Sequence, residues 1–154
     1  MIPYLTGPAD FGEHYPSAIR YTFEKRAVAF SGDILITCKG SGVGKLNTAD
    51  SMIAISRQLM SIQPLIVSPQ YVKIIAQSMN KSLREKIVGI AIPGISRVDV
   101  LEAIVKLPPL PEQHRIVTKI NEFTTLCDTL KTRLQQAQTT QVLLADALVA
   151  QAVT

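Results

Sequence analysis

The sequence of 154 residues contains no tryptophan, and aromatic residues make up only 5% of it. Apolar residues nevertheless make up 47%, which is typical of a folded chain rather than a disordered one. The core must therefore be built mainly from Ile, Val, Leu and Ala. A chain of this length has room for one core and an appended segment, so we expect one domain with an extension.

Long apolar runs and clustered cysteines are also missing. No run approaches the roughly 20 residues of a membrane-spanning helix, and the N-terminus lacks a basic segment followed by an apolar one. We therefore expect a soluble, cytoplasmic protein with no membrane partner. The two cysteines, Cys38 and Cys127, lie far apart in sequence with no second ligand pair near either. This spacing indicates neither a disulfide framework nor a zinc site.

The net charge of +4 is unevenly placed along the chain. Residues 1–110 carry 12 Lys/Arg and 8 Asp/Glu, whereas residues 111–154 carry 4 of each. The basic residues cluster in segments 20–26, 39–45 and 81–86, with Arg97 in a later loop. Each cluster alone is typical of a solvated surface. Several of them on one β-rich domain favour contacts with the phosphates of a DNA duplex.

Residues 1–110 have the short apolar runs and frequent Gly and Pro that are typical of strands and turns. We expect strands at 27–30 and 34–38, and a short helix or strand at 99–106. A helix should open with Ser68 as N-cap and Pro69 in its first turn. This helix should follow the end of a strand, and the core-facing residues of segment 64–79 are expected to be Leu65, Tyr71, Ile74, Ile75 and Met79.

The segment Lys39-Gly-Ser-Gly-Val-Gly-Lys45 invites comparison with phosphate-binding loops. A Walker A loop needs glycine where Lys39 stands and Ser or Thr where Leu46 stands, and a dinucleotide loop needs glycine at Lys45. The segment therefore fits neither motif. Two interpretations stay open, a plain turn between strands and a loop that lies against the DNA backbone.

The composition changes at Leu107-Pro-Pro-Leu-Pro111, after which the chain contains no Gly and no Pro. The prolines predict a stiff extended hinge, with Pro111 in the first turn of a helix that runs to about residue 150. Apolar positions alternate at spacings of four and three, as in a coiled coil. The expected seam consists of Ile120, Phe123, Cys127, Leu130, Leu134, Leu144 and Leu148, with the polar Gln141 in the same series. A single amphipathic helix packed on its own domain is the commoner alternative, but the length of the repeat favours the coiled coil.

Catalytic motifs are not recognisable. His14 and His114 have no nucleophile at motif spacing, and the acidic residues Asp10, Glu13, Glu24 and Asp33 lack the spacing of a nuclease metal site. We therefore expect no active site, no bound metal and no cofactor.

Several segments together resemble one family. Leu107-Pro-Pro-Leu-Pro-Glu-Gln-His-Arg-Ile-Val117 resembles the signature with which type I restriction–modification specificity subunits leave a recognition domain and enter a connecting helix. The segments 32–37 and 40–45 are similar to that family's Gly-Asp-Ile-Leu strand and Gly-rich turn. Segments 2–7, 10–12, 119–123 and 126–131 are also similar to parts of the family, so the resemblance covers nearly the whole chain.

This resemblance implies an α+β fold, with a β-rich DNA target-recognition domain at residues 1–108 and a proline hinge and long helix at 109–154. It implies a noncatalytic reader of one half of a split DNA target, on which methyltransferase (modification) and restriction subunits assemble. A full subunit has two recognition domains, whereas we expect this chain to have one and to begin inside it. We therefore expect the chain to form a homodimer through its helix.

We expect DNA contacts from Lys39, Ser41, Lys45, Lys81, Arg84 and Arg97, and a modification-subunit interface at Pro109, Glu112 and Gln113. The alternative function is a helical oligomerisation module whose β domain binds protein.

Overall fold

The computed structural model describes residues 1–40, 42–85 and 94–152, with only the backbone described for residues 81–85. The chain divides into two compact units, Met1–His114 and Arg115–Thr154. The sequence-based boundary lies between residues 108 and 109. The difference arises because the first turn of the long helix belongs to the first unit.

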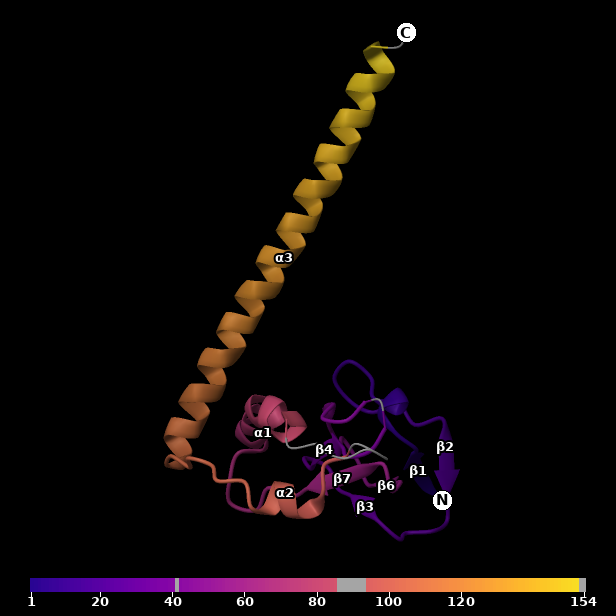
Figure 1. Cartoon of the computed structure of the whole chain (residues 1–154), viewed down its shortest axis with the longest axis vertical. Helices are drawn as coiled ribbons and strands as arrows, with labels where there is room; N and C mark the ends of the chain where they lie inside the picture. The colour runs from indigo at the N-terminus through magenta and orange to yellow at the C-terminus, as the bar shows by residue number, and fades with distance from the viewer. Residues whose placement is uncertain (41, 86–93, 153–154) are drawn as a thin grey trace. The chain divides into compact units, whose positions relative to one another are not determined.

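The first sheet of the N-terminal unit has four strands in the order β2-β1-β6-β3 (Figure 1). Its strands are β1 (Ile2–Leu5), β2 (Arg20–Thr22), β3 (Val28–Ala29) and β6 (Ile53–Ile55). β1 pairs with β6 in parallel, and the other two pairs are antiparallel. β2 is therefore an edge strand, hydrogen-bonded within this sheet only to β1.

The second sheet has three antiparallel strands in the order β5-β4-β7. They are β4 (Ile34–Thr37), β5 (Leu46–Thr48) and β7 (Leu59–Ile62). All four residues of β4 are buried, which explains why this run is apolar and β-branched without polar alternation. Strands at both positions expected from the sequence, 27–30 and 34–38, are present, each somewhat shorter than its apolar run.

The core consists of two clusters of buried aliphatic residues. Leu35 belongs to the first, with Leu5, Ala29, Ala49, Ile53, Ile55 and Leu59. Ile36 belongs to the second, with Cys38, Val43 and Ile95. No buried residue of either cluster is aromatic, as the composition requires, although the partly buried Phe11 packs against the first. Neighbouring residues of β4 therefore pack into both core clusters.

Helix α1 (Pro69–Glu85) begins where the sequence predicts, and it contacts β4 and β5. The Val72 N–H donates to the Ser68 carbonyl at 3.0 Å, which closes the first turn. Tyr71 is buried as expected, at 7% exposure. The expectation for Leu65 is wrong, because β7 ends at Ile62 and Leu65 lies in the link between β7 and α1, where it is 82% exposed.

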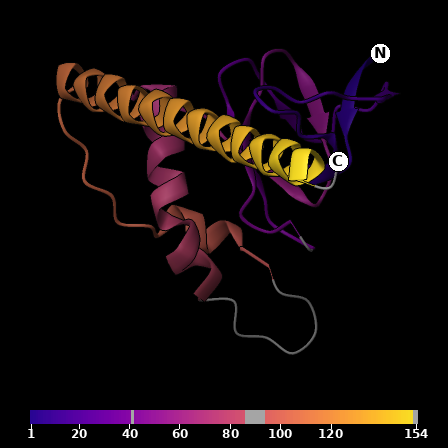
Figure 2. The same ribbon diagram turned by 90° about the horizontal axis from the view of Figure 1, so that it is seen from above.

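The later helices are α2 (Arg97–Leu101) and α3 (Leu110–Ala152). In α2, the Ser96 hydroxyl accepts the Asp99 N–H at 3.2 Å and the Asp99 carboxylate accepts the Ser96 N–H at 2.7 Å, which is a capping box. α3 is one unbroken helix (Figures 1 and 2), since after Pro111 the sequence contains neither Gly nor Pro. The expected α+β class, with a β-rich domain followed by a long helix, is confirmed.

Candidate nucleic-acid interface

The Gly-rich segment forms a tight turn that returns the chain from β4 to β5. The Gly44 N–H donates to the Thr37 carbonyl at 2.8 Å, and the Lys45 N–H donates to the Gly42 carbonyl at 2.9 Å. Gly44 has a φ of 83°, which favours glycine. The segment is therefore a turn between strands, and Lys39 and Lys45 are both exposed on it. Ser41 lies outside the described residues.

Two other segments lie against this turn. Lys39 forms an isolated β-bridge with Gly94, and the Ile95 N–H donates to the Cys38 carbonyl at 2.9 Å. A Cβ atom at Gly94 would lie 2.9 Å from that same carbonyl oxygen, so only glycine allows this approach. From α1, the Asn80 side-chain Nδ2 donates to the Gly44 carbonyl at 2.6 Å.

These contacts gather three basic segments that are far apart in sequence. Lys39 and Lys45 lie on the turn, and the exposed Arg97 is the first residue of α2, three positions after Gly94. Lys81 and Arg84 follow Asn80 on the last turns of α1, although their side chains lie outside the described part of the chain. We call Lys39, Lys45 and Arg97 the basic surface.

The fourth basic cluster lies elsewhere. Arg20 is on edge strand β2, and Lys25 and Arg26 follow in the turn after it, all three exposed. Within the described residues, no hydrogen bond or ion pair joins this cluster to the basic surface.

The proline segment is bound to the domain at two points. The Tyr71 hydroxyl donates to the Lys106 carbonyl at 3.1 Å. The Gln113 carboxamide oxygen accepts the Ser68 N–H at 3.0 Å, and its nitrogen donates to the Pro108 carbonyl at 2.9 Å. Gln113 is only 3% exposed. One buried amide therefore joins the start of α1, the proline segment and the first turn of α3.

This role could not be predicted from the sequence, because a glutamine in a first helical turn usually faces solvent. Gln113 was expected at a modification-subunit interface, yet its side chain is occupied within the domain. Its neighbours are more accessible: Pro109 is exposed and Glu112 is partly exposed. An interface role for Pro109 and Glu112 stays a prediction.

Two of the acidic residues considered for a metal site, Asp10 and Asp33, serve as local hydrogen-bond acceptors. The Asp10 carboxylate accepts the Thr6 N–H at 2.6 Å and the Thr6 hydroxyl at 2.9 Å. The Asp33 carboxylate accepts the Phe30 N–H at 3.0 Å and the Ser61 hydroxyl at 2.7 Å. In the described part of the chain, no three His, Cys, Asp or Glu residues gather as metal ligands would.

The two cysteines differ in environment. Burial raises the pKa of the Cys38 thiol above its ordinary value, which disfavours the reactive thiolate. Cys127 is exposed on α3, and both cysteines are free. Cys38 is therefore a structural residue of the second core cluster.

The expected seam residues of α3 are exposed in the single chain. The exposed fractions are 37% for Ile120, 59% for Phe123, 55% for Leu130, 61% for Leu134, 60% for Leu144 and 66% for Leu148. Large aliphatic residues at this spacing form a stripe that is typical of a helix with a partner. None of the helices that the structure describes, α3 included, combines the length and hydropathy needed to cross a lipid bilayer.

Comparison with known proteins decides the family. Residues 1–139 match the family model described as type I restriction modification DNA specificity domain. The chain belongs to this DNA specificity family. The match confirms the resemblance carried by the Pro-Pro-Leu-Pro-Glu-Gln-His signature, and it runs through both the β-rich unit and most of α3.

Relatives of the specificity family agree in sequence and in fold. The chain is 33% identical over 129 residues to the type I restriction enzyme EcoEI specificity subunit of Escherichia coli, covering 76% of this chain and 22% of that protein. The HsdS subunit from Thermoanaerobacter tengcongensis matches with a TM-score of 0.74 and 27% identity over 84% of this chain and 31% of that one.

A third match comes from a structure described as the basis of complex assembly and conformational transition of the type I R-M system. Its TM-score is 0.76, with 27% identity over 84% of this chain and 32% of that chain. The chain thus spans a third or less of the length of these relatives. The family's description names DNA specificity, which is a recognition role and not a catalytic one.

The buried amide of Gln113 generates the first prediction. Gln113→Leu removes both hydrogen bonds and leaves the buried Ser68 N–H without an acceptor. The variant should lose at least about 1–3 kcal/mol of unfolding free energy, measured by urea denaturation. Gln136→Leu, at an exposed position of the same helix, is the matched control and should change stability little. Equal stability of the two variants would show that the amide contributes nothing.

Proposed function

We propose that this chain is a DNA target-recognition domain with its connecting helix, which helps to place methyltransferase and restriction subunits on one half of a bipartite DNA target. The observation that carries the proposal is the match of residues 1–139 to a DNA specificity family. The names of the relatives, specificity subunits of type I enzymes, support the same role.

The basic surface is the proposed site of DNA contact. Lys39, Lys45 and Arg97 are exposed, and the contacts of Gly94 with the turn hold their segments together. Lysine is a compact flexible cation, so these lysines would bind phosphates and fix the register of the domain on the duplex. Ser41, Lys81 and Arg84 keep their proposed roles, since Ser41 belongs to the sequence of this turn, and Lys81 and Arg84 follow Asn80 by one and four residues.

The helix α3 is the proposed protein-binding part. Its seam leaves large apolar side chains exposed, and burying each of them is worth roughly 1.5–3 kcal/mol. Pro109 and Glu112, at the start of the helix, are proposed to contact the modification subunit. Gln113 would support that surface from within the domain, where it holds the first turn in place.

Salt dependence of duplex binding tests the DNA part of the proposal. Neutralising three to five phosphates gives a slope of log K against log salt of about −3 to −5. We expect this slope for the whole chain in fluorescence anisotropy titrations with a labelled duplex between low and physiological salt. Binding that does not respond to salt, or no binding, would count against DNA recognition and favour a protein-binding β domain.

A charge-reversal variant tests whether the basic surface makes this contact with DNA. Lys39→Glu with Lys45→Glu should weaken binding strongly and reduce the slope, without changing the thermal melt, because both side chains are exposed. Lys131→Glu with Arg133→Glu, on the exposed surface of α3, makes the same change in net charge and serves as control. A collapsed melt in the first variant would show that these lysines are structural.

Self-association tests the role of α3. We propose that two chains pair through residues 111–150, most simply as an antiparallel dimer that imitates a two-domain subunit. The free energy gained by burying the six large apolar residues of each seam exceeds the roughly 4–15 kcal/mol that association costs. Sedimentation at micromolar concentration should therefore show a dimer, and a strictly monomeric chain would refute this part of the proposal.

Paired substitutions identify the seam. Leu130→Asp with Leu134→Asp puts charges into the proposed interface and should give monomers. Thr125→Asp with Thr132→Asp adds the same charge on the opposite side of the helix and should leave the dimer intact. In an antiparallel pair, Gln141 lies near Cys127 or Leu130 of the other helix, where a polar residue can fix the register.

A further inference from the structure

Edge strand β2 exposes apolar side chains that its own domain does not use. Ile19 is 81% exposed, Tyr21 57% and Phe23 80%. They stand at every second position through β2 and its flanks, so they share one face of the extended segment. The chain has only four Tyr and four Phe. Two of these eight aromatic residues are placed on one short surface strand.

Residues 19–26, which include this strand, also carry three cations. Arg20, Lys25 and Arg26 are all exposed, and Glu24 is the one acidic residue between Ile19 and Arg26. Lysine is depleted at the cores of protein interfaces, and clustered exposed cations are typical of surfaces that contact the phosphates of nucleic acids. The charge of this segment therefore complements a polyanion.

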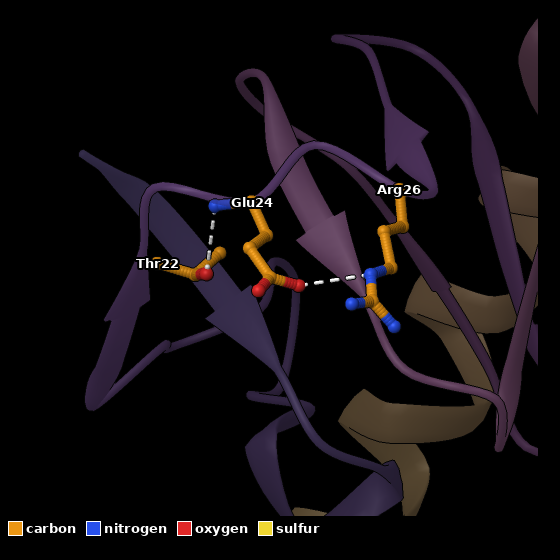
Figure 3. Close-up of polar contacts among 3 residues, drawn as sticks. All are labelled: Thr22, Glu24 and Arg26. Carbon is orange, nitrogen blue, oxygen red and sulfur yellow. Dashed lines mark hydrogen bonds and ion pairs between the residues drawn. The ribbon is translucent and has the colours of Figure 1, made fainter.

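The turn after β2 holds one of these cations in position. The Glu24 N–H donates to the Thr22 hydroxyl at 3.0 Å, and the Glu24 carboxylate oxygen lies 2.9 Å from Arg26 Nε (Figure 3). Arg26 keeps 88% of its side-chain area exposed. Among the described residues, neither of its two Nη nitrogens has a hydrogen-bond or ion-pair partner. The Nε atom of the guanidinium is thus paired with Glu24, whereas its two Nη nitrogens, which form the terminal fork, are available to a ligand.

A depression of 530 Å³ lies beside this arginine. Thr22, Glu24 and Arg26 line one part of it, and Tyr4 and Arg57 line another. Arg57 is exposed and brings a second guanidinium to the rim. The site therefore combines two arginines with an aromatic side chain, a set of groups that can contact both the edge of a base and a nearby phosphate.

We propose that residues 19–26 form a second DNA-contacting element, in which the Nη fork of Arg26 binds the O6 and N7 atoms of a guanine in the major groove. Edge strands and two-stranded ribbons fit this groove, and arginine to guanine is the commonest specific contact. Arg20 and Lys25 contact phosphates. Arg20 pairs with Tyr4 and so shares the face of the depression, whereas Tyr21 and Phe23 lie on the opposite face. This inference rests on the proposed function, because it requires that the partner is duplex DNA.

Selection from a pool of random duplexes by the whole chain, followed by sequencing, is the test. Wild type should enrich a motif that contains a guanine. Arg26→Lys keeps the charge but removes the fork, so preference for that guanine should fall about tenfold or more while the other positions persist. Glu24→Gln should weaken the same preference less, and Tyr21→Ala with Phe23→Ala, on the opposite face of β2, should leave the motif unchanged. Thermal melts should be unchanged, since all these side chains are exposed.

The outcomes separate this inference from the proposed function. Lys39→Glu with Lys45→Glu should lower recovery of all duplexes without changing the motif. A motif that survives Arg26→Lys would overturn the inference and leave DNA recognition standing. Salt-dependent binding with no enriched motif would also overturn it. If wild type binds no duplex at all, the proposed function fails and the inference fails with it.

Discussion

Burial of β4 is the constraint on which the rest of the N-terminal unit depends. Ile34, Leu35 and Thr37 are fully buried and Ile36 nearly so. Leu35 packs in one core cluster and Ile36 in the other, so this one strand joins the two halves of the domain. The Gly-rich turn follows its C-terminal end, and α1 packs against it. The basic surface therefore rests on the most buried element of the fold.

The polar contacts around that strand place charged groups without burying them. Main-chain contacts at Cys38 and Gly94, and the Asn80 amide at Gly44, hold the segments together, while Lys39, Lys45 and Arg97 stay in solvent. This arrangement suits a polyanionic partner, because exposed cations keep their hydration until phosphate replaces it. The long helix has balanced charge and an apolar seam, which suits protein partners instead.

Local pattern in the sequence was enough to predict the main elements. The Ser68-Pro69 start of α1, the apolar run of β4 and the Gly-free, Pro-free stretch of α3 each follow from nearest-neighbour chemistry. Long-range contacts were not predictable in this way. The amide of Gln113 meets Ser68, which is 45 residues away, and Lys39 meets Gly94. Leu65 is apolar, but no local signal shows that the chain leaves it in solvent. The family signature supplied the function, which periodicity alone did not.

We propose that the β-rich unit binds DNA while α3 binds protein. Hydrogen exchange of the whole chain, compared with and without excess duplex at low salt, tests this division of roles. We expect slower exchange in the segments around the Gly-rich turn and at 94–101, with no change along 115–150 beyond that caused by self-association. Protection confined to α3, or bound DNA that leaves the turn unprotected, would contradict it.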